Sequence, residues 1–311
     1  MRRLNYETKD LGFSFACVTA VMVAAGIVLE LIFGTVAGGW KFWLMQGLYT
    51  SLIGASAVFY ALFSKTKFFV ATKLNKAPNA AHTLWGCASV VFLVLVMSQV
   101  NNLFLDILKD AGLSRPSVSL ENNVTGLILC ACILPAFAEE IVFRGTVAQS
   151  LYNCKSQVVA VVVSGALFSV FHANPAQTLH QFVLGMLLTL IVFRSGSLWT
   201  SVIVHLFNNA FVVALSYTPL GDDAFWNFQT NAPWAFTLTI VGFVGFVLCT
   251  IVYVATTRSR WQPLDDTSRK DSASDEAESG AEKSGFKYSI AMLFVAIAVC
   301  ALLWVSQLIW G

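Results

Sequence analysis

The chain has 311 residues, of which 57% are hydrophobic and 12% are charged. That charged share is about half the share in an ordinary soluble domain, which excludes a soluble globular protein. The formal net charge of +2 is too balanced to indicate a nucleic-acid-binding protein. Because a membrane-spanning helix needs about 20 mostly apolar residues, this composition predicts an all-α, polytopic transmembrane helix bundle of eight or nine spans.

Apolar runs separated by polar breaks give the predicted spans in chain order. The working count is nine, with candidate helices at 11–34, 42–63, 84–105, 124–150, 156–173, 177–194, 197–216, 233–256 and 286–310. Between the last two spans, residues 257–285 are rich in Ser, Asp, Glu, Lys and Arg. Such a segment has almost nothing to bury, so it is predicted to be a disordered polar loop.

The distribution of basic residues predicts how the spans are oriented. Four lysines crowd the second connection, namely Lys65, Lys67, Lys73 and Lys76, whereas the loop 217–232 has two aspartates and no Lys or Arg. The positive-inside rule then places the N-terminus inside and, with nine spans, the C-terminus outside. The sequence thus predicts an integral, multi-pass protein of the cell membrane, in contact with the lipid bilayer.

Charged residues inside the fourth span form the pattern E-E-x-x-x-R. Glu139 and Glu140 are adjacent, so on a helix their side chains point about 100° apart and cannot do one job together. Arg144 follows Glu140 by four residues, the favoured spacing for an ion pair. This leaves Glu139 as the carboxylate available for general base chemistry. The alternative is a purely structural network in which all three residues lock helices together.

Two later spans carry histidines with a partner one turn away. Phe168 and His172 share a face of the fifth span, and His205 and Asn209 share a face of the seventh. Asn208 points elsewhere and is predicted to make a hydrogen bond between helices. Taken singly, a histidine at the end of a span is more often an interfacial residue, and a His and Asn pair more often packs helices together.

Depth along the helices brings these residues together. If the fourth and fifth spans turn near Cys154, Glu139 and His172 lie roughly 22 and 27 Å from that turn at 1.5 Å per residue. Counted from Gly196 on the same face, His205 and Asn209 lie at roughly 14 and 20 Å. The sequence therefore predicts one polar pit holding a carboxylate, two imidazoles and a carboxamide.

These motifs resemble those of the CAAX prenyl endopeptidases and bacteriocin-processing enzymes (CPBP, or Abi), a family of intramembrane glutamate proteases. The family pattern is E-E-x-x-x-R, F-x-x-x-H and H-x-x-x-N in this order, and all three motifs are present here. The stretch Phe193-Arg-Ser-Gly-Ser-Leu-Trp-Thr is also similar to the family's R-x-G-S-L-W segment. The resemblance covers residues 124–216, about a third of the chain.

The resemblance implies a peptidase acting on a peptide or protein substrate at the membrane, either prenylated or carrying a leader peptide. Glu139 and His172 would activate water, His205 and Asn209 would stabilise an oxyanion, and Glu140 and Arg144 would brace the span. Together with the predicted spans, the resemblance predicts five parts of the chain: N-terminal transmembrane helices (1–123), a catalytic core (124–216), an eighth span (217–256), the disordered loop 257–285 and a C-terminal span (286–311).

Alternatives remain open from the sequence alone. Glu, His and His are also ligand types of catalytic zinc, although the H-E-x-x-H spacing is absent, and we expect no cofactor. Intramembrane Glu and His residues also mark transporters and proton relays, and a family member can act as a scaffold without cleavage. His180 matches no motif and is predicted to be interfacial. Charge counting makes the pit extracytoplasmic, whereas the resemblance implies that it opens to the cytosol.

Overall fold

The computed structural model describes residues 2–34, 39–113, 123–153, 156–217, 235–259 and 276–310. The described residues contain helices and no strands, so the predicted all-α class is confirmed. The helices that cross the bundle, in chain order, are α1 (Asp10–Phe33), α2 (Gly39–Phe63), α4 (Ala80–Asp110), α6 (Leu134–Val142), α8 (Gln157–Phe171), α9 (Thr178–Ser195), α10 (Leu198–Ser216), α11 (Ala235–Thr256) and α13 (Glu276–Trp310).

Short elements complete the connections. The helix α3 (Phe68–Ala71) lies in the basic connection, and the 3-10 turn η3 (Pro175–Gln177) joins α8 to α9. The fourth span is one continuous helical rod made of α5 (Val124–Gly126), π-helix η1 (Leu127–Ile133), α6, π-helix η2 (Phe143–Val147) and α7 (Ala148–Ser150). These bounds match the predicted span 124–150.

Eight helical segments among the described residues are long and apolar enough to cross a membrane. The fifth predicted span, 156–173, corresponds to α8, which has 15 residues and falls below that length. Because α8 packs along α9, it needs less apolar length than a helix that meets lipid on its own. The prediction of eight or nine spans is confirmed.

The polar loop 257–285 is only partly as predicted. Helix α13 begins at Glu276, so the last ten residues of that segment are helical rather than disordered. Ala, Glu and Lys are good helix formers, and an adjoining apolar span supplies the nucleus from which such a helix propagates. Residues 260–275, the acidic connection 218–234 and the turn at Cys154 lie outside the described residues.

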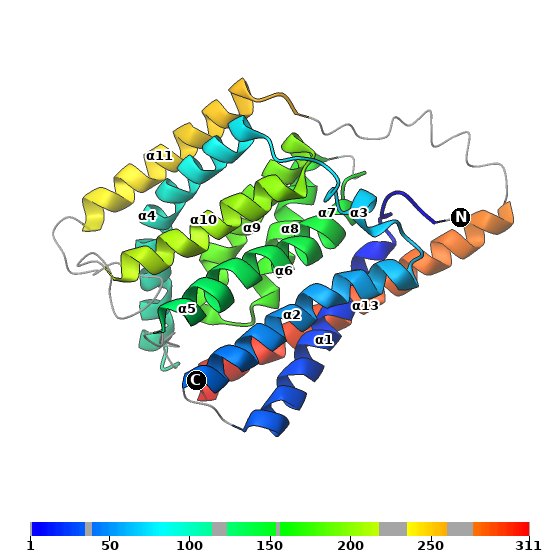
Figure 1. The fold of residues 1–311 in the computed structure, drawn as a ribbon, viewed down its shortest axis with the longest axis horizontal. Coiled ribbons are helices and arrows are strands. Elements are labelled where there is room, and N and C mark those ends of the chain that lie inside the picture. The colour runs from blue at the N-terminus through cyan, green and yellow to red at the C-terminus, as the bar shows by residue number, and fades with distance from the viewer. Residues whose placement is uncertain are drawn as a thin grey trace.

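The bundle has a middle layer flanked by two outer groups (Figure 1). The fourth span, α8, α9 and α10 form the middle, α4 and α11 pack together on one side, and α1, α2 and α13 lie on the other. Two apolar cores hold these layers together. One surrounds Phe143, Phe168 and Phe193, and the other lies where α4, α9 and α10 meet, around Leu93, Leu188 and Val204.

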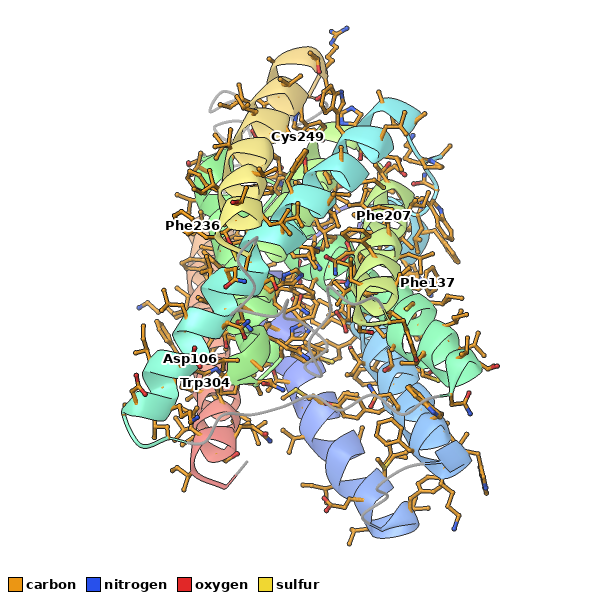
Figure 2. All side chains as sticks on the ribbon, turned by 90° about the vertical axis from the view of Figure 1, so that its left-hand side faces the viewer. Asp106, Phe137, Phe207, Phe236, Cys249 and Trp304 are labelled. Atoms are coloured by element: carbon orange, nitrogen blue, oxygen red, sulfur yellow. The ribbon has the colours of Figure 1, made fainter. Side chains whose placement is uncertain are left out.

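The outside of the bundle is apolar. Phe236 on α11 is 73% exposed and Phe137 is 39% exposed, and both side chains lie at the periphery of the bundle (Figure 2). In water, apolar surfaces of this kind would favour aggregation, whereas in a bilayer they contact the lipid tails. This arrangement identifies a multi-pass helical membrane protein.

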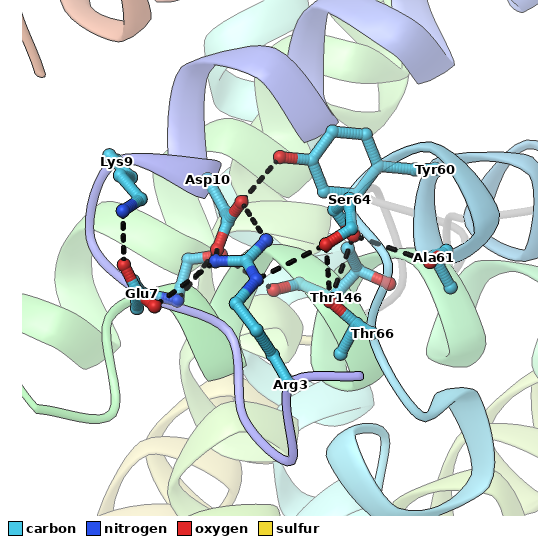
Figure 3. A network of polar contacts seen from close by, with 10 residues as sticks. Arg3, Glu7, Lys9, Asp10, Tyr60, Ala61, Ser64, Thr66 and Thr146 are labelled. Carbon is cyan, nitrogen blue, oxygen red and sulfur yellow. Dashed lines mark hydrogen bonds and ion pairs between the residues drawn. The ribbon is translucent and has the colours of Figure 1, made fainter. Parts of the chain in front are cut away.

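The N-terminus and the basic connection lie at the same face of the bundle. The backbones of Arg3 and Lys67 are hydrogen-bonded to each other, and the backbone of Leu198 donates to Lys73. Arg3 also forms a bidentate ion pair with buried Asp10, at 2.8 and 2.9 Å, and Asp10 accepts from the Tyr60 hydroxyl at 2.7 Å (Figure 3). This network fixes the start of α1 against the end of α2.

Close packing of α8 against α9 depends on two glycines. A Cβ atom at Gly185 would lie 2.9 Å from the Cα atom of Gly165, which is closer than real Cβ contacts. The paired glycines therefore let the two backbones touch. This contact brings the C-terminal end of α8, with His172, and the first turns of α9 against the same cavity.

Candidate functional site

The residues predicted to meet in one pit line a single cavity of about 710 Å³. Glu139 comes from α6, His172 follows the last residue of α8, and His205 and Asn209 come from α10. The Glu139 Oε2 atom lies 3.7 Å from His172 Nε2 and 4.0 Å from His205 Nε2. The structure thus brings together the four side chains that were predicted to meet in one polar pit.

The two adjacent glutamates have different surroundings. Glu139 faces the cavity with 17% of its side chain exposed, whereas Glu140 and Arg144 are fully buried. Arg144 Nη1 donates to Glu140 Oε1 at 2.7 Å, which is the ion pair expected from the spacing. The same oxygen also lies 2.9 Å from His205 Nδ1. Glu140 therefore contacts the ring of a cavity residue as well as its salt-bridge partner.

The ring of Phe168 contacts the guanidinium group of Arg144 and the imidazole rings of both cavity histidines. The Arg144 guanidinium carbon lies 4.0 Å from the centre of the Phe168 ring, a cation–π geometry. The same ring meets His172 edge to face at 4.7 Å and His205 at 6.0 Å. With no exposed surface, Phe168 acts as the common support of both imidazoles.

Hydrogen bonding sets the proton positions on both imidazoles. His172 Nδ1 lies 2.8 Å from the Phe168 carbonyl oxygen, which can only accept, so Nδ1 is the donor. By the same reasoning, His205 Nδ1 donates to the Glu140 carboxylate, which is paired with Arg144. The Nε2 atoms of both rings are left to face Glu139, each available to accept a proton.

A chain of hydrogen bonds orients the Asn209 amide. His180 Nε2 lies 3.3 Å from Asn208 Oδ1, and Asn208 Nδ2 donates to Asn209 Oδ1 at 3.1 Å. With its oxygen held in this way, Asn209 turns its NH₂ group towards the Cys132 carbonyl oxygen, 3.5 Å away, and the cavity. The predicted bond of Asn208 between helices is confirmed.

The prediction that His180 is interfacial is wrong. Its side chain is buried with 5% exposure, because η3 turns the chain so that the first turn of α9 packs against α10. The sequence carries a weak signal for this role. His180 and Gln181 are adjacent polar residues at the start of an otherwise apolar span, where neither is expected without a partner or a cavity.

The walls of the cavity include helices outside the motif-bearing spans. Residues of α1, α2 and α13 line it, among them Glu30, Trp43 and Gln307, together with Ala173 and Asn174 from the connection after α8. Glu30, Trp43 and Gln307 lie at the ends of their helices away from the basic connection. The cavity therefore reaches the membrane face opposite the N-terminus and the lysine-rich segment.

The groups that face the cavity are one carboxylate and two imidazole nitrogens. Within the described part of the chain, no three His, Cys, Asp or Glu side chains are grouped as a set of metal ligands. His205 Nδ1 is already engaged by Glu140, and the remaining groups are one carboxylate and two Nε2 atoms. Chemically, these groups can polarise a small molecule such as water and accept its proton.

Comparison with known proteins finds two relationships for the segment that bears the motifs. Residues 121–211 match the family described as "Type II CAAX prenyl endopeptidase Rce1-like". The chain is also 27% identical over 94 residues to a protein of Bacillus subtilis (strain 168) named "Putative membrane peptidase YdiL". That alignment covers 30% of this chain and 38% of the relative's length. No solved structure matches the chain.

Proposed function

We propose that the protein is an intramembrane endopeptidase of the Rce1-like type II CAAX prenyl endopeptidase family, because residues 121–211 match the model of that family. The observation that carries the proposal is the cavity at membrane depth in which Glu139 faces the Nε2 atoms of His172 and His205. Its substrate would be a membrane-associated peptide or protein, either prenylated or bearing a leader sequence. All roles assigned to single residues below are part of this proposal.

The first step is the activation of water by Glu139 and His172. Their facing atoms, Oε2 and Nε2, are both acceptors and lie 3.7 Å apart. A water molecule bound there donates one O–H to each, which directs its lone pair away from both groups and towards a carbonyl carbon. Glu139 takes one proton as the oxygen attacks, and the C=O double bond opens to an oxyanion.

The second step uses the residues on α10. The Asn209 NH₂ group and the Nε2–H group of His205 lie on the same cavity wall and would donate to the oxyanion. For this the His205 ring would be an imidazolium, in which Nδ1 still donates to Glu140 and Nε2 also carries a proton. Glu139 then gives its proton to the leaving nitrogen as the C–N bond breaks. The second proton of the water passes to His172 Nε2 as the new carboxyl group forms, and from there to solvent. The products are a carboxylate, an amine and this proton, and no enzyme nucleophile is consumed. The Glu140 and Arg144 pair holds α6 and the His205 ring during both steps.

The direct test is a cleavage assay with the purified, full-length protein in detergent. Two probes cover the two substrate classes, namely a farnesylated fluorogenic peptide ending in a CAAX tetrapeptide and a membrane-anchored peptide with a leader sequence. We expect one probe to be cut at a single bond, with fragments identified by mass spectrometry. Failure to cleave either class, by protein that is folded and monodisperse, would count against the proposal.

A transporter or proton relay is the rival from another class, since Glu and His residues within membrane spans also serve ion pathways. The measurement that separates the two functions is proton flux into liposomes containing the protein. A proton relay predicts flux without fragments, whereas the peptidase predicts fragments without flux. A scaffold without catalysis predicts neither but binds the uncut peptide.

Hydrolysis should proceed without zinc. We expect less than one zinc per protein in active preparations, because in the proposed reaction Glu139 and His172 activate the water and no Lewis acid is required. The measurement is elemental analysis of purified protein alongside its cleavage rate. Activity that a chelator abolishes and zinc alone restores would instead support a metal-assisted reaction.

A further inference from the structure

One buried polar side chain in the cavity has no role in the chemistry described above. Gln181, three residues after the start of α9, is 4% exposed and lines the same cavity as Glu139, His172 and His205. Its Oε1 atom is buried without a hydrogen-bond partner. Buried side-chain amides are normally hydrogen-bonded, and an exception in a native structure needs an explanation.

The polar side chains nearest to Gln181 in sequence and in the motifs are hydrogen-bonded, whereas among the other cavity-lining residues Trp43 also keeps a buried atom, Nε1, without a partner. His180, next to Gln181 in sequence, bonds Asn208, and Asn208 bonds Asn209. His172 and His205 each have a partner for Nδ1. Gln181 therefore lines the cavity and carries an acceptor that its surroundings leave without a donor, so a rotation of the amide about its side-chain bonds would offer that acceptor to a bound molecule.

We propose that Gln181 binds the main chain of the substrate beside the scissile bond. A primary amide offers an acceptor and a donor group, which matches the N–H and C=O groups of a peptide unit. It is neutral, so it can lie in a water-poor cavity without the desolvation cost of a charge. An isoprenoid chain has no hydrogen-bonding group, so this contact would be made with the peptide portion of any substrate.

The position on α9 suits this role. The turn η3 lies between His172 and α9, and Gln181 lines the same cavity as the imidazole proposed to activate water. A peptide fixed there by its main chain would present its carbonyl carbon to Glu139 and His172. The contact would contribute mainly to substrate binding, because it involves no atom of the bond being broken. This inference rests on the proposed endopeptidase function.

The test compares Gln181→Met, which keeps the length of the side chain and removes its amide, with wild type on the peptide probe that wild type cleaves. The loss of one hydrogen bond should raise KM about fivefold with kcat changed by less than about twofold. The matched control is Gln157→Met, because Gln157 also has a buried amide atom without a partner but does not line this cavity. The control should leave KM unchanged, and neither variant should lower the thermal unfolding midpoint.

A substrate series supplies the readout that a structural role would not move. Peptides in which single amides flanking the scissile bond are replaced by esters lack one N–H donor each. For wild type, one ester should raise KM about fivefold, and Gln181→Met should be insensitive to that same replacement. Equal sensitivity of the two proteins at every position, or an unchanged KM for Gln181→Met, would overturn the inference. If wild type cleaves no probe, the proposed function fails instead.

Discussion

Glu139→Gln should lower the cleavage rate by about 100-fold or more while the protein stays folded and inserted in the membrane. The substitution keeps the shape of the side chain and its place beside His172, but an amide cannot take the proton of water. Glu139 forms no ion pair with a Lys or Arg among the described residues, and its side chain meets the cavity rather than the core. The measurement is the cleavage rate of purified protein, with thermal unfolding as the check on folding.

The matched control is Glu30→Gln, because Glu30 is a second carboxylate lining the same cavity. Among the described residues it forms no hydrogen bond or ion pair with either histidine, so its variant should keep kcat within about twofold. A change in KM is compatible with this control, because Glu30 lies on the wall that would meet the substrate. The pair separates the loss of a proton acceptor from a general loss of negative charge in the cavity. Full activity of Glu139→Gln would exclude the general base mechanism.

Arg144→Ala should reduce the amount of folded protein and lower its free energy of unfolding by about 3–5 kcal/mol. The guanidinium is fully buried, donates to Glu140, and lies over the ring of Phe168. Removing it leaves the Glu140 carboxylate buried without its guanidinium partner, and removes the contact of Arg144 with the ring of Phe168. Thermal unfolding in detergent and the yield of monodisperse protein measure this effect.

The division of roles between the adjacent glutamates is tested in the same experiment. Glu140→Ala should destabilise the fold because it strands the buried Arg144, whereas Glu139→Ala should lower activity with little loss of stability. Equal destabilisation by these two alanine variants would contradict the assignment of Glu140 to support and of Glu139 to chemistry.

The spans and the meeting of the motif residues can be predicted from the sequence. Both rest on regular geometry, because helices rise by a fixed amount per residue and apolar runs must span the bilayer. Counting residues along the chain is therefore enough to predict that Glu139, His172 and His205 meet within the same part of the membrane. The four-residue spacing is enough to predict the ion pair of Arg144 with Glu140. Their catalytic roles remain predictions.

Contacts that depend on helix rotation and on neighbours cannot be predicted in this way. The bond from His205 Nδ1 to Glu140 requires α10 and α6 to face each other in one particular rotation, which no spacing within either helix reveals. The burial of His180 has the same origin, since it depends on how η3 turns α9 against α10. The start of α13 at Glu276, ten residues before the predicted span, could not be predicted, because composition alone does not show that a helix extends from an apolar span into a polar segment.

The helices α1, α2 and α13 form one wall of the cavity although they lie outside the segment that resembles known proteins. None of these helices lies within residues 121–211, yet Glu30, Trp43 and Gln307 line the same space as Glu139. Under the proposed function, the groups that act on the substrate and much of the surface that would meet the rest of it therefore lie in separate parts of the sequence. Sequence changes in α1, α2 and α13 would then alter which substrate binds without changing the residues proposed to act on it. Similarity within residues 121–211 alone therefore says little about the identity of the substrate.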